Sequence, residues 1–253
     1  MGLPVFYATE QNIDTSVGVV TITGADARHL VKSLRVRQGD AVTTGDANGT
    51  LYEAVIESSL QDTVTMRIVS RRYLPPERPQ VVLFQAMPRF TAMDEAVSRA
   101  AESGASRVVP FVSRCSPLEA VRKSGSRLGR WQSIARECSK TSRRAWPLEV
   151  RAPVAGLIDK TMLDTVGCCV VFWEAETRAL SDVLPDEPPR SIGIVIGPEG
   201  GLEPAEVDVM RTLGCKTASL GALNIRSEGA GSYAAILIRY HYGLLARGGS
   251  PVE

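Results

Sequence analysis

The fold is decided by the stretch Ile196-Gly197-Pro198-Glu199-Gly200-Gly201-Leu202 of this 253-residue chain. The apolar segment 191–196 runs into this stretch and is typical of a short buried strand. A helical pattern begins directly after it at Glu203-Pro204, and proline suits the first turn of a helix. A strand, a glycine loop and a helix in that order predict a ligand crevice at the carboxyl edge of a mostly parallel sheet.

A second strand–loop–helix unit follows the first. The segment 216–221 has strand character, and the loop after it runs to Glu228 before a long apolar helix. Ser227 is a natural cap for that helix. Arg226, beside it, is suited to hold a phosphate or a developing negative charge by a bidentate contact, unless it pairs with Glu228. The apolar segment 233–238 is predicted to be buried, either in the core or at a subunit interface.

The glycine loop favours a phosphate, or the polar part of a nucleoside, as its ligand. Its glycines permit positive φ and close ligand approach, and the helix after it begins with free N–H groups. No Gly-Lys-Ser/Thr follows and the spacing is not the dinucleotide pattern, so a Walker loop is excluded. Glu199 is predicted to accept N–H bonds within the loop, and a tight turn without a ligand is the alternative. Glu174 and Glu176 follow another predicted strand, and each either faces the same ligand or is solvated.

Composition limits the classes of protein to which the chain can belong. Hydrophobic residues make up 44% of it, and no apolar run approaches the roughly 20 residues that span a bilayer. The N-terminus lacks the pattern of a signal peptide. The five cysteines show neither metal spacing nor a disulfide framework, and two histidines do not make a histidine-rich metal site. We therefore expect a cytoplasmic protein with no membrane segment and no metal.

Positive charge is concentrated in one segment. Residues 107–151 contain 11 Lys or Arg and 3 Asp or Glu, whereas the remainder contains 18 and 25, respectively. Segregated positive charge favours contact with a polyanion, nucleic acid first, and a solvated helix face is the alternative.

Two domains joined by a linker are predicted. Residues 1–74 contain five strand-like segments and one short helix, which suggests a small barrel. Asp26 is placed to cap that helix, whose basic face either grips RNA backbone or is solvated. The proline-rich residues 75–79 are typical of a linker. Strands and helices alternate over residues 80–248, which favours a layered α/β domain. The helices predicted there include 93–103, 126–142 and 178–184.

The motifs around the glycine loop resemble those of a known family. Segments 196–202, 220–221 and 225–228 resemble the cofactor-binding motifs of the bacterial 16S ribosomal RNA (uracil-N3) methyltransferases, the ribosomal small subunit methyltransferase E family. Residues 26–30 and 130–135 resemble that family's N-terminal helix and basic helix, so that the likeness covers nearly the whole chain. One departure is Glu203, which stands where the family usually has a serine and is a weaker cap residue.

The resemblance implies both a fold and a reaction. The fold would be a PUA-like RNA-binding β-barrel over residues 1–74, followed by a SPOUT α/β domain with a C-terminal trefoil knot over residues 80–248. The family uses S-adenosyl-L-methionine to methylate N3 of a decoding-centre uridine in 16S rRNA within the assembled 30S subunit, and it acts as a homodimer. The cofactor-binding residues implied here are Phe172, Trp173, Glu174, Gly197, Pro198, Glu199, Gly200, Gly201, Leu220, Gly221, Asn224, Ile225 and Arg226.

Arg226 and Glu228 are the implied catalytic residues. Uridine N3 must lose a hydrogen, so Glu228 is the candidate base, while Arg226 would stabilise negative charge on the uracil oxygens or hold the target phosphate. Two other functions stay open: a ribose 2′-O RNA methyltransferase of the same class, and a non-catalytic RNA-binding ribosome assembly factor. RNA contacts are predicted at Arg28, His29, Lys32, Arg35, Arg89, Arg114, Arg130, Lys140, Arg143 and Arg144.

Overall fold

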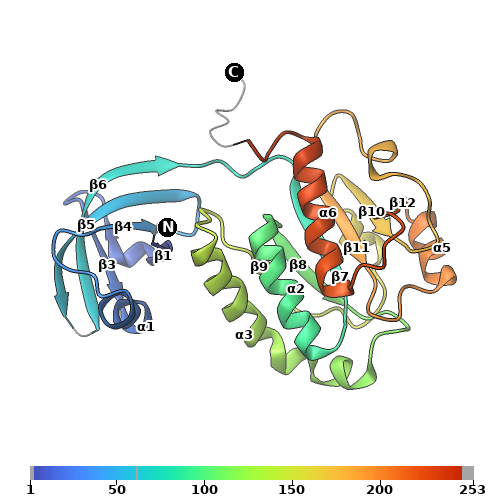
Figure 1. Ribbon diagram of the computed structural model, residues 1–253, viewed down its shortest axis with the longest axis horizontal. Coiled ribbons are helices and arrows are strands. Elements are labelled where there is room, and N and C mark those ends of the chain that lie inside the picture. The colour runs from blue at the N-terminus through green and yellow to red at the C-terminus, as the bar shows by residue number, and fades with distance from the viewer. Residues whose placement is uncertain (1–2, 61, 247–253) are drawn as a thin grey trace. The chain divides into compact units, whose positions relative to one another are not determined.

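The computed structural model describes residues 3–60 and 62–246, and it divides into two compact units (Figure 1). The N-terminal unit comprises Met1–Pro76 together with Glu137–Pro147, and the C-terminal unit comprises Glu77–Arg136 together with Leu148–Glu253. The boundary near residue 76 falls inside the linker predicted at 75–79. The predicted domain end at 247–248 lies outside the described residues.

The N-terminal unit is built on a six-stranded sheet with the strand order β1-β4-β5-β6-β3-β2. The hairpin between β4 and β5 turns at Asn48-Gly49, as this dipeptide predicts, and Gly49 has a φ of 97°. One face of the sheet packs on the short helix α1 and on η2 after it, where Ala27 and Leu30, respectively, are buried in the core. The strands are β1 (Phe6–Tyr7), β2 (Ile13–Asp14), β3 (Val19–Thr23), β4 (Ala41–Gly45), β5 (Thr50–Leu60) and β6 (Thr63–Tyr73), and the helical segments are η1 (Glu10–Asn12), α1 (Gly24–Arg28) and η2 (His29–Ser33).

A segment far along the sequence completes the N-terminal unit. The last turn of the long helix α3 (Leu118–Thr141) contains Lys140, which is buried. Its Nζ donates to Asp26 Oδ1 at 2.6 Å and to Glu137 Oε1 at 2.7 Å. Beyond the helix, the indole Nε1 of Trp146 donates to the carbonyl of Leu74 at 2.8 Å. Segment 137–147 therefore groups with the N-terminal unit and not with the second domain as predicted, because it contacts α1, Leu74 and strand β1, where the hydroxyl of Tyr7 donates to the carbonyl of Arg144 at 2.8 Å.

Two roles predicted from the sequence are corrected by the same contacts. Asp26 does not cap α1, whose N-cap is Thr23, because its carboxylate receives the ammonium of Lys140. Lys140 is only 4% exposed and binds two carboxylates, so it is a structural residue and not an RNA contact.

Replacing Lys140 by methionine is expected to lower the free energy of unfolding by about 2 kcal/mol, since two charge-assisted hydrogen bonds are lost from a buried position. The change is measured as a shift in the midpoint of urea unfolding. Lys123→Met is the control, because Lys123 pairs with Glu119 on an exposed surface of the same helix and should cost less than about 0.5 kcal/mol. Equal effects of the two substitutions would contradict a structural role for Lys140.

The C-terminal unit is a parallel six-stranded sheet with the order β12-β10-β11-β7-β8-β9. Side chains alternate along its strands, so that Val82 and Phe84 belong to a core cluster shared with α4 and α5, whereas Leu83 lies against α6 at Gly231. Helices therefore cover both faces. The strands are β7 (Gln80–Ala86), β8 (Arg107–Phe111), β9 (Glu149–Val150), β10 (Cys168–Phe172), β11 (Ser191–Ile196) and β12 (Lys216–Ala218). In addition to α3, the helical segments are α2 (Phe90–Ser103), α4 (Lys160–Leu163), η3 (Leu180–Asp182), α5 (Pro204–Thr212) and α6 (Ser227–His241).

The alternation of strands and helices is confirmed, with local differences. The helix predicted at 126–142 starts earlier, at Leu118. The helix predicted at 178–184 is reduced to the single turn η3, because the carbonyl of Arg178 accepts from the backbone N–H of Ser219 instead of from a helical partner. The trefoil knot stays a prediction.

Candidate functional site

The carboxyl ends of neighbouring parallel strands meet at one cavity of the C-terminal unit. The loops after β10, β11 and β12 form its walls, and the cavity has a volume of about 870 Å³. The position agrees with the edge predicted from the two strand–loop–helix units. Every residue predicted to bind a cofactor lines this cavity, as do Glu228 and, of the predicted RNA contacts, Arg89.

Little room is left for a side chain at the glycines of the glycine loop. Gly201 has a φ of 75°, and a Cβ added there would lie 2.6 Å from Oε1 of Glu174. A Cβ at Gly197 would lie 3.0 Å from the carbonyl carbon of Gly201. The positive φ favours glycine at 201, where an added Cβ would displace the Glu174 carboxylate, and at 197 a Cβ would press against the backbone of the loop itself.

Two acidic residues of this region, Glu199 and Glu203, behave differently from the prediction. Glu199 accepts a hydrogen bond from the backbone N of Arg89 at 3.0 Å, which ties the glycine loop to the start of α2 rather than to itself. Glu203 is an effective cap after all, because it forms a capping box with Glu206 at the start of α5. The Oε1 of Glu206 also accepts from the backbone N of Arg114 at 2.9 Å, so this buried carboxylate joins two loops.

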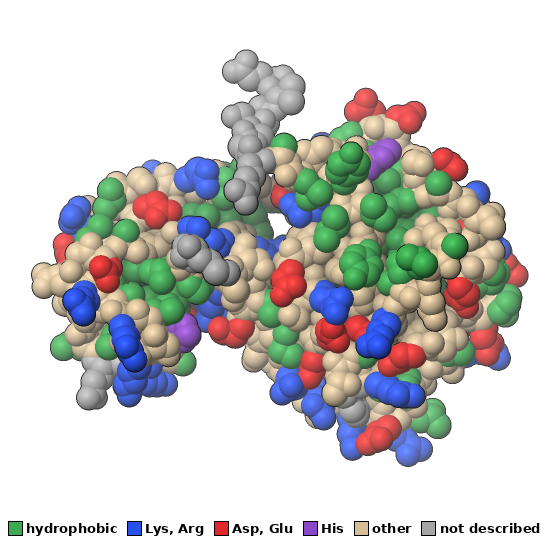
Figure 2. All heavy atoms as spheres, viewed as in Figure 1, with side chains coloured by type: hydrophobic (Ala, Val, Ile, Leu, Met, Phe, Trp, Pro, Cys, Tyr) green, Lys and Arg blue, Asp and Glu red, His purple; other side chains and the backbone are tan. Residues whose placement is uncertain are grey.

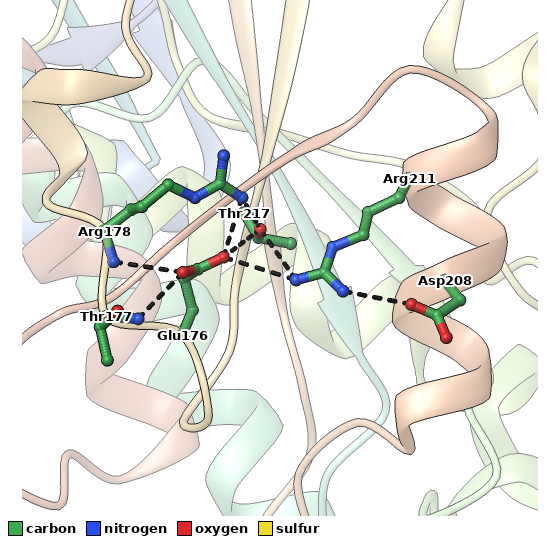
Figure 3. A network of polar contacts seen from close by, with 6 residues as sticks. All are labelled: Glu176, Thr177, Arg178, Asp208, Arg211 and Thr217. Atoms are coloured by element: carbon green, nitrogen blue, oxygen red, sulfur yellow. Dashed lines mark hydrogen bonds and ion pairs between the residues drawn. The ribbon is translucent and has the colours of Figure 1, made fainter.

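The pair Glu174 and Glu176 is separated by the fold into two roles. Glu174 lines the cavity, whereas Glu176 is not among the lining residues. Glu176 instead forms a network with Arg178, Arg211 and Thr217 (Figure 3). Hydrogen bonds from Arg178 and Thr217 hold the pKa of the Glu176 carboxyl well below its ordinary value. Glu176 therefore stays ionised, and its hydrogen bonds fix the conformation of the loop after β10. The same loop places Glu174 at the cavity.

The second wall of the cavity carries the catalytic candidates. Arg226 is 89% exposed on its side chain, and its Nη1 lies 4.0 Å from Oε1 of Glu228, so the two form at most a loose ion pair. The Glu228 side chain is only 12% exposed. Ser227 does not cap α6, since Arg226 is the N-cap, and the Ser227 hydroxyl instead donates to the carbonyl of Gly197 at 2.5 Å.

Helix α6 beyond the cavity is buried on one side only. Ala234, Ala235 and Ile238 are buried in the core, as one alternative for 233–238 predicted, and burial of the other side chains at a subunit interface stays a prediction. Four large side chains remain exposed along the other side, and Figure 2 shows hydrophobic side chains gathered over this helix. We call them the α6 stripe; they are Tyr233, Ile236, Leu237 and Tyr240.

The predicted RNA contacts other than Lys140 are spread over both units. Arg28, His29, Lys32 and Arg35 are exposed around α1 and η2, where Arg28 also pairs with Asp62. Arg89, Arg114, Arg130 and Arg143 are exposed, and Arg130 pairs with Asp94 on α2. Arg144 is half-buried, and its Nε donates to the carbonyl of Trp146 at 2.9 Å.

Sequence reasoning missed one buried polar residue next to the cavity. Gln85 lies near the end of strand β7, after four apolar residues, and donates to Ser227 Oγ at 3.0 Å. The signal was an amide directly after an apolar run, at the carboxyl end of a strand. Across residues 3–60 and 62–246, no cluster of His, Cys, Asp and Glu has the arrangement needed for a metal ion. Within the same ranges, no helix has the length and apolar character to cross a bilayer.

Comparison with known proteins supplies independent information. Residues 76–239 match the family model of an RNA methyltransferase domain, and residues 22–64 match that of an RNA methyltransferase PUA domain. The ribosomal RNA small subunit methyltransferase E of Mycobacterium bovis is 28% identical over 225 residues, which cover 85% of this chain and 84% of the relative. Its counterpart in Bacillus subtilis is 27% identical over 245 residues, covering 94% and 95%.

Solved structures share the fold over nearly the whole chain. The crystal structure of a ribosomal RNA small subunit methyltransferase E from Neisseria gonorrhoeae, bound to S-adenosyl methionine, aligns with a TM-score of 0.81 at 23% identity. The alignment covers 94% of this chain and 98% of that one. The arrangement of a PUA domain before a SPOUT methyltransferase domain is therefore the fold of this chain.

Proposed function

The chain belongs to the RNA methyltransferase family, and we propose that it transfers a methyl group from S-adenosyl-L-methionine to N3 of a specific decoding-centre uridine in 16S rRNA. One observation carries the proposal: the loops holding Glu174, Gly197–Gly201 and Arg226 converge on a single cavity at the carboxyl edge of the parallel sheet. The relatives named ribosomal RNA small subunit methyltransferase E support the substrate class. We assign the reaction to the assembled 30S subunit in the cytoplasm.

The cavity suits the methyl donor in size and in chemistry. Its volume of about 870 Å³ lies within the range of roughly 300–1,000 Å³ that is usual for small-molecule sites. The glycines at 197, 200 and 201 leave backbone groups bare toward a ligand, and Glu174 offers a carboxylate to ribose hydroxyls or to a cationic amino group. The related structure from Neisseria gonorrhoeae holds S-adenosyl methionine, which supports the same ligand here.

Arg226 and Glu228 of the second wall have separate roles in the proposed reaction. S-adenosyl-L-methionine supplies an activated methyl group when bound, so the protein must align the uracil and remove the N3 proton. Arg226 is placed to stabilise the negative charge that spreads over the uracil oxygens as N3 loses its proton. Among the described residues of the cavity, the carboxylates are Glu174, Glu199 and Glu228. Glu199 holds the Arg89 N–H and Glu174 lies against Gly201, so we assign proton removal to Glu228.

Transfer of labelled methyl groups to purified small subunits tests this function. The expected result is incorporation into 16S rRNA, with 3-methyluridine found by nucleoside mass spectrometry. A parallel reaction on protein-free 16S rRNA tests the need for the assembled subunit. A 2′-O-methylated product would indicate the ribose methyltransferase, and failure to bind S-adenosyl-L-methionine in calorimetry would indicate a non-catalytic assembly factor.

We further propose that the active form is a homodimer in which the α6 stripe is covered by a second copy. The stripe begins at Tyr233, about one helical turn beyond the cavity residues Glu228 and Ala230 on the same helix, so its burial would place the two cavities near the interface. A large apolar surface of this kind on the described part of the chain favours association in water.

Leu237→Glu is expected to convert the dimer into a monomer of about the chain mass of 27.2 kDa, because a charge in an apolar contact is costly to desolvate. Sedimentation equilibrium measures the mass. Val209→Glu is the matched control, since Val209 is 47% exposed on α5 and Leu237 is 45% exposed on α6. A monomeric wild type, or a Leu237→Glu protein that remains dimeric, would refute the proposed interface.

A further inference from the structure

A buried amide joins the two loops that form the cavity walls. Gln85 is fully buried on β7, where it pairs in register with Ile196 of β11. Its Nε2 donates to Ser227 Oγ at 3.0 Å and to the carbonyl of Ala86 at 3.1 Å, and the carbonyl of Gly197 is a more distant acceptor at 3.4 Å. Ser227 Oγ donates in turn to the same carbonyl at 2.5 Å. We call Gln85, Ser227 and the Gly197 carbonyl the loop clasp.

The loop clasp connects the glycine loop to the arginine wall directly. Gly197 is the first residue of the glycine loop, and Ser227 is the first residue of α6 and follows Arg226 immediately. Both residues line the cavity, whereas Gln85 lies behind them. The short contacts of the clasp therefore fix how far Arg226 stands from the loop.

Fold stability does not account for the amide at this position. The Oε1 of Gln85 is buried and has no hydrogen-bond partner among the described residues, an arrangement that destabilises a folded protein. The neighbouring positions of β7, including Leu83 and Phe84, are apolar and buried. An apolar side chain of similar size would remove the unpaired oxygen, so the amide has a role that offsets its cost.

We propose that Gln85 is a positioning residue for methyl transfer, which sets the placement of Arg226 relative to the glycine loop through Ser227. This inference rests on the proposed function. Gln85 itself contacts neither the methyl donor nor the RNA in this proposal. We expect a substitution of Gln85 to change the rate of methyl transfer only by changing the position of Ser227.

The test compares Gln85→Met, Ser227→Ala and the double variant. Methionine matches glutamine in size but has no amide, and Ser106→Ala is the control because it removes a 2.9 Å bond to Val81 at the other end of β7. We expect kcat to fall about tenfold in each single variant, with little change in the KM for the methyl donor. The double variant should be no worse than either single one, because both substitutions break the same connection. The thermal midpoint of Gln85→Met should equal or exceed that of the wild type.

Hydrogen exchange gives a readout that does not depend on turnover. Amides of 199–202 and 220–226 should exchange faster in Gln85→Met than in the wild type, and Ser106→Ala should leave them unchanged. Additive losses in the double variant, or normal kcat with a lowered thermal midpoint, would overturn the inference. If the wild type transfers no methyl group, the proposed function fails, and unchanged exchange of both loops in Gln85→Met would then overturn the clasp separately.

Discussion

Arg226→Ala is expected to lower methyl transfer to the small subunit by at least about 100-fold, which is the usual effect of removing one group that stabilises developing charge. The arginine side chain is almost wholly exposed at the mouth of the cavity and makes only a loose contact with Glu228, so its removal should leave the fold intact. Single-turnover methylation with saturating cofactor measures the loss, and the thermal midpoint checks the fold.

Two further variants separate the charge of Arg226 from its shape. Arg226→Lys keeps the positive charge but loses the planar fork, so partial recovery would indicate charge stabilisation and full loss would indicate bidentate recognition. Arg151→Ala removes an exposed arginine that pairs with Glu149, and should leave the rate unchanged. Near-normal turnover of Arg226→Ala would remove this residue from the mechanism.

The cavity could be located from the sequence because its determinants are local. Apolar strands followed by glycines identify the carboxyl edge of a parallel sheet, and all loops that end there must lie close together. The residues predicted from 172–174, 197–201 and 220–226 therefore line one cavity. The same local logic explains why α2 ends where predicted, with Gly104 at a φ of 88°.

The roles that sequence could not assign depend on partners far along the chain. In the sequence, Glu176 is equivalent to Glu174. What distinguishes it in the structure is its contacts with Thr217 and Arg211, which lie in segments after β11. In the sequence, Lys140 is likewise one of several basic residues of a helix, and its ion pair with Asp26 is seen only in the structure. The position of 137–147 beside the early strands is likewise a matter of tertiary contacts, which neither hydrophobic periodicity nor composition encodes.

Gly201→Ala is expected to abolish measurable binding of S-adenosyl-L-methionine while costing only about 1–2 kcal/mol of stability. The stability cost follows from the φ of 75°, which an alanine adopts with strain. The loss of binding follows from Glu174, because the new methyl group would lie 2.6 Å from its Oε1 and the carboxylate must move. Since that carboxylate is the far end of a side chain lining the cavity, the shift would disturb the site rather than the core.

Gly214→Ala is a control that introduces the backbone strain of an alanine at positive φ without displacing Glu174. Gly214 also has a positive φ, 96°, but a Cβ there would meet nothing within 4 Å, so its alanine variant should lose similar stability and bind the cofactor normally. Isothermal titration calorimetry measures both affinities. If the effect acts through Glu174, adding Gly201→Ala to a Glu174→Ala protein should change the affinity far less than adding it to the wild type. Equal losses in the two backgrounds would mean that the glycine acts on the ligand through its own backbone, and Glu174 would then have no part in shaping the cavity.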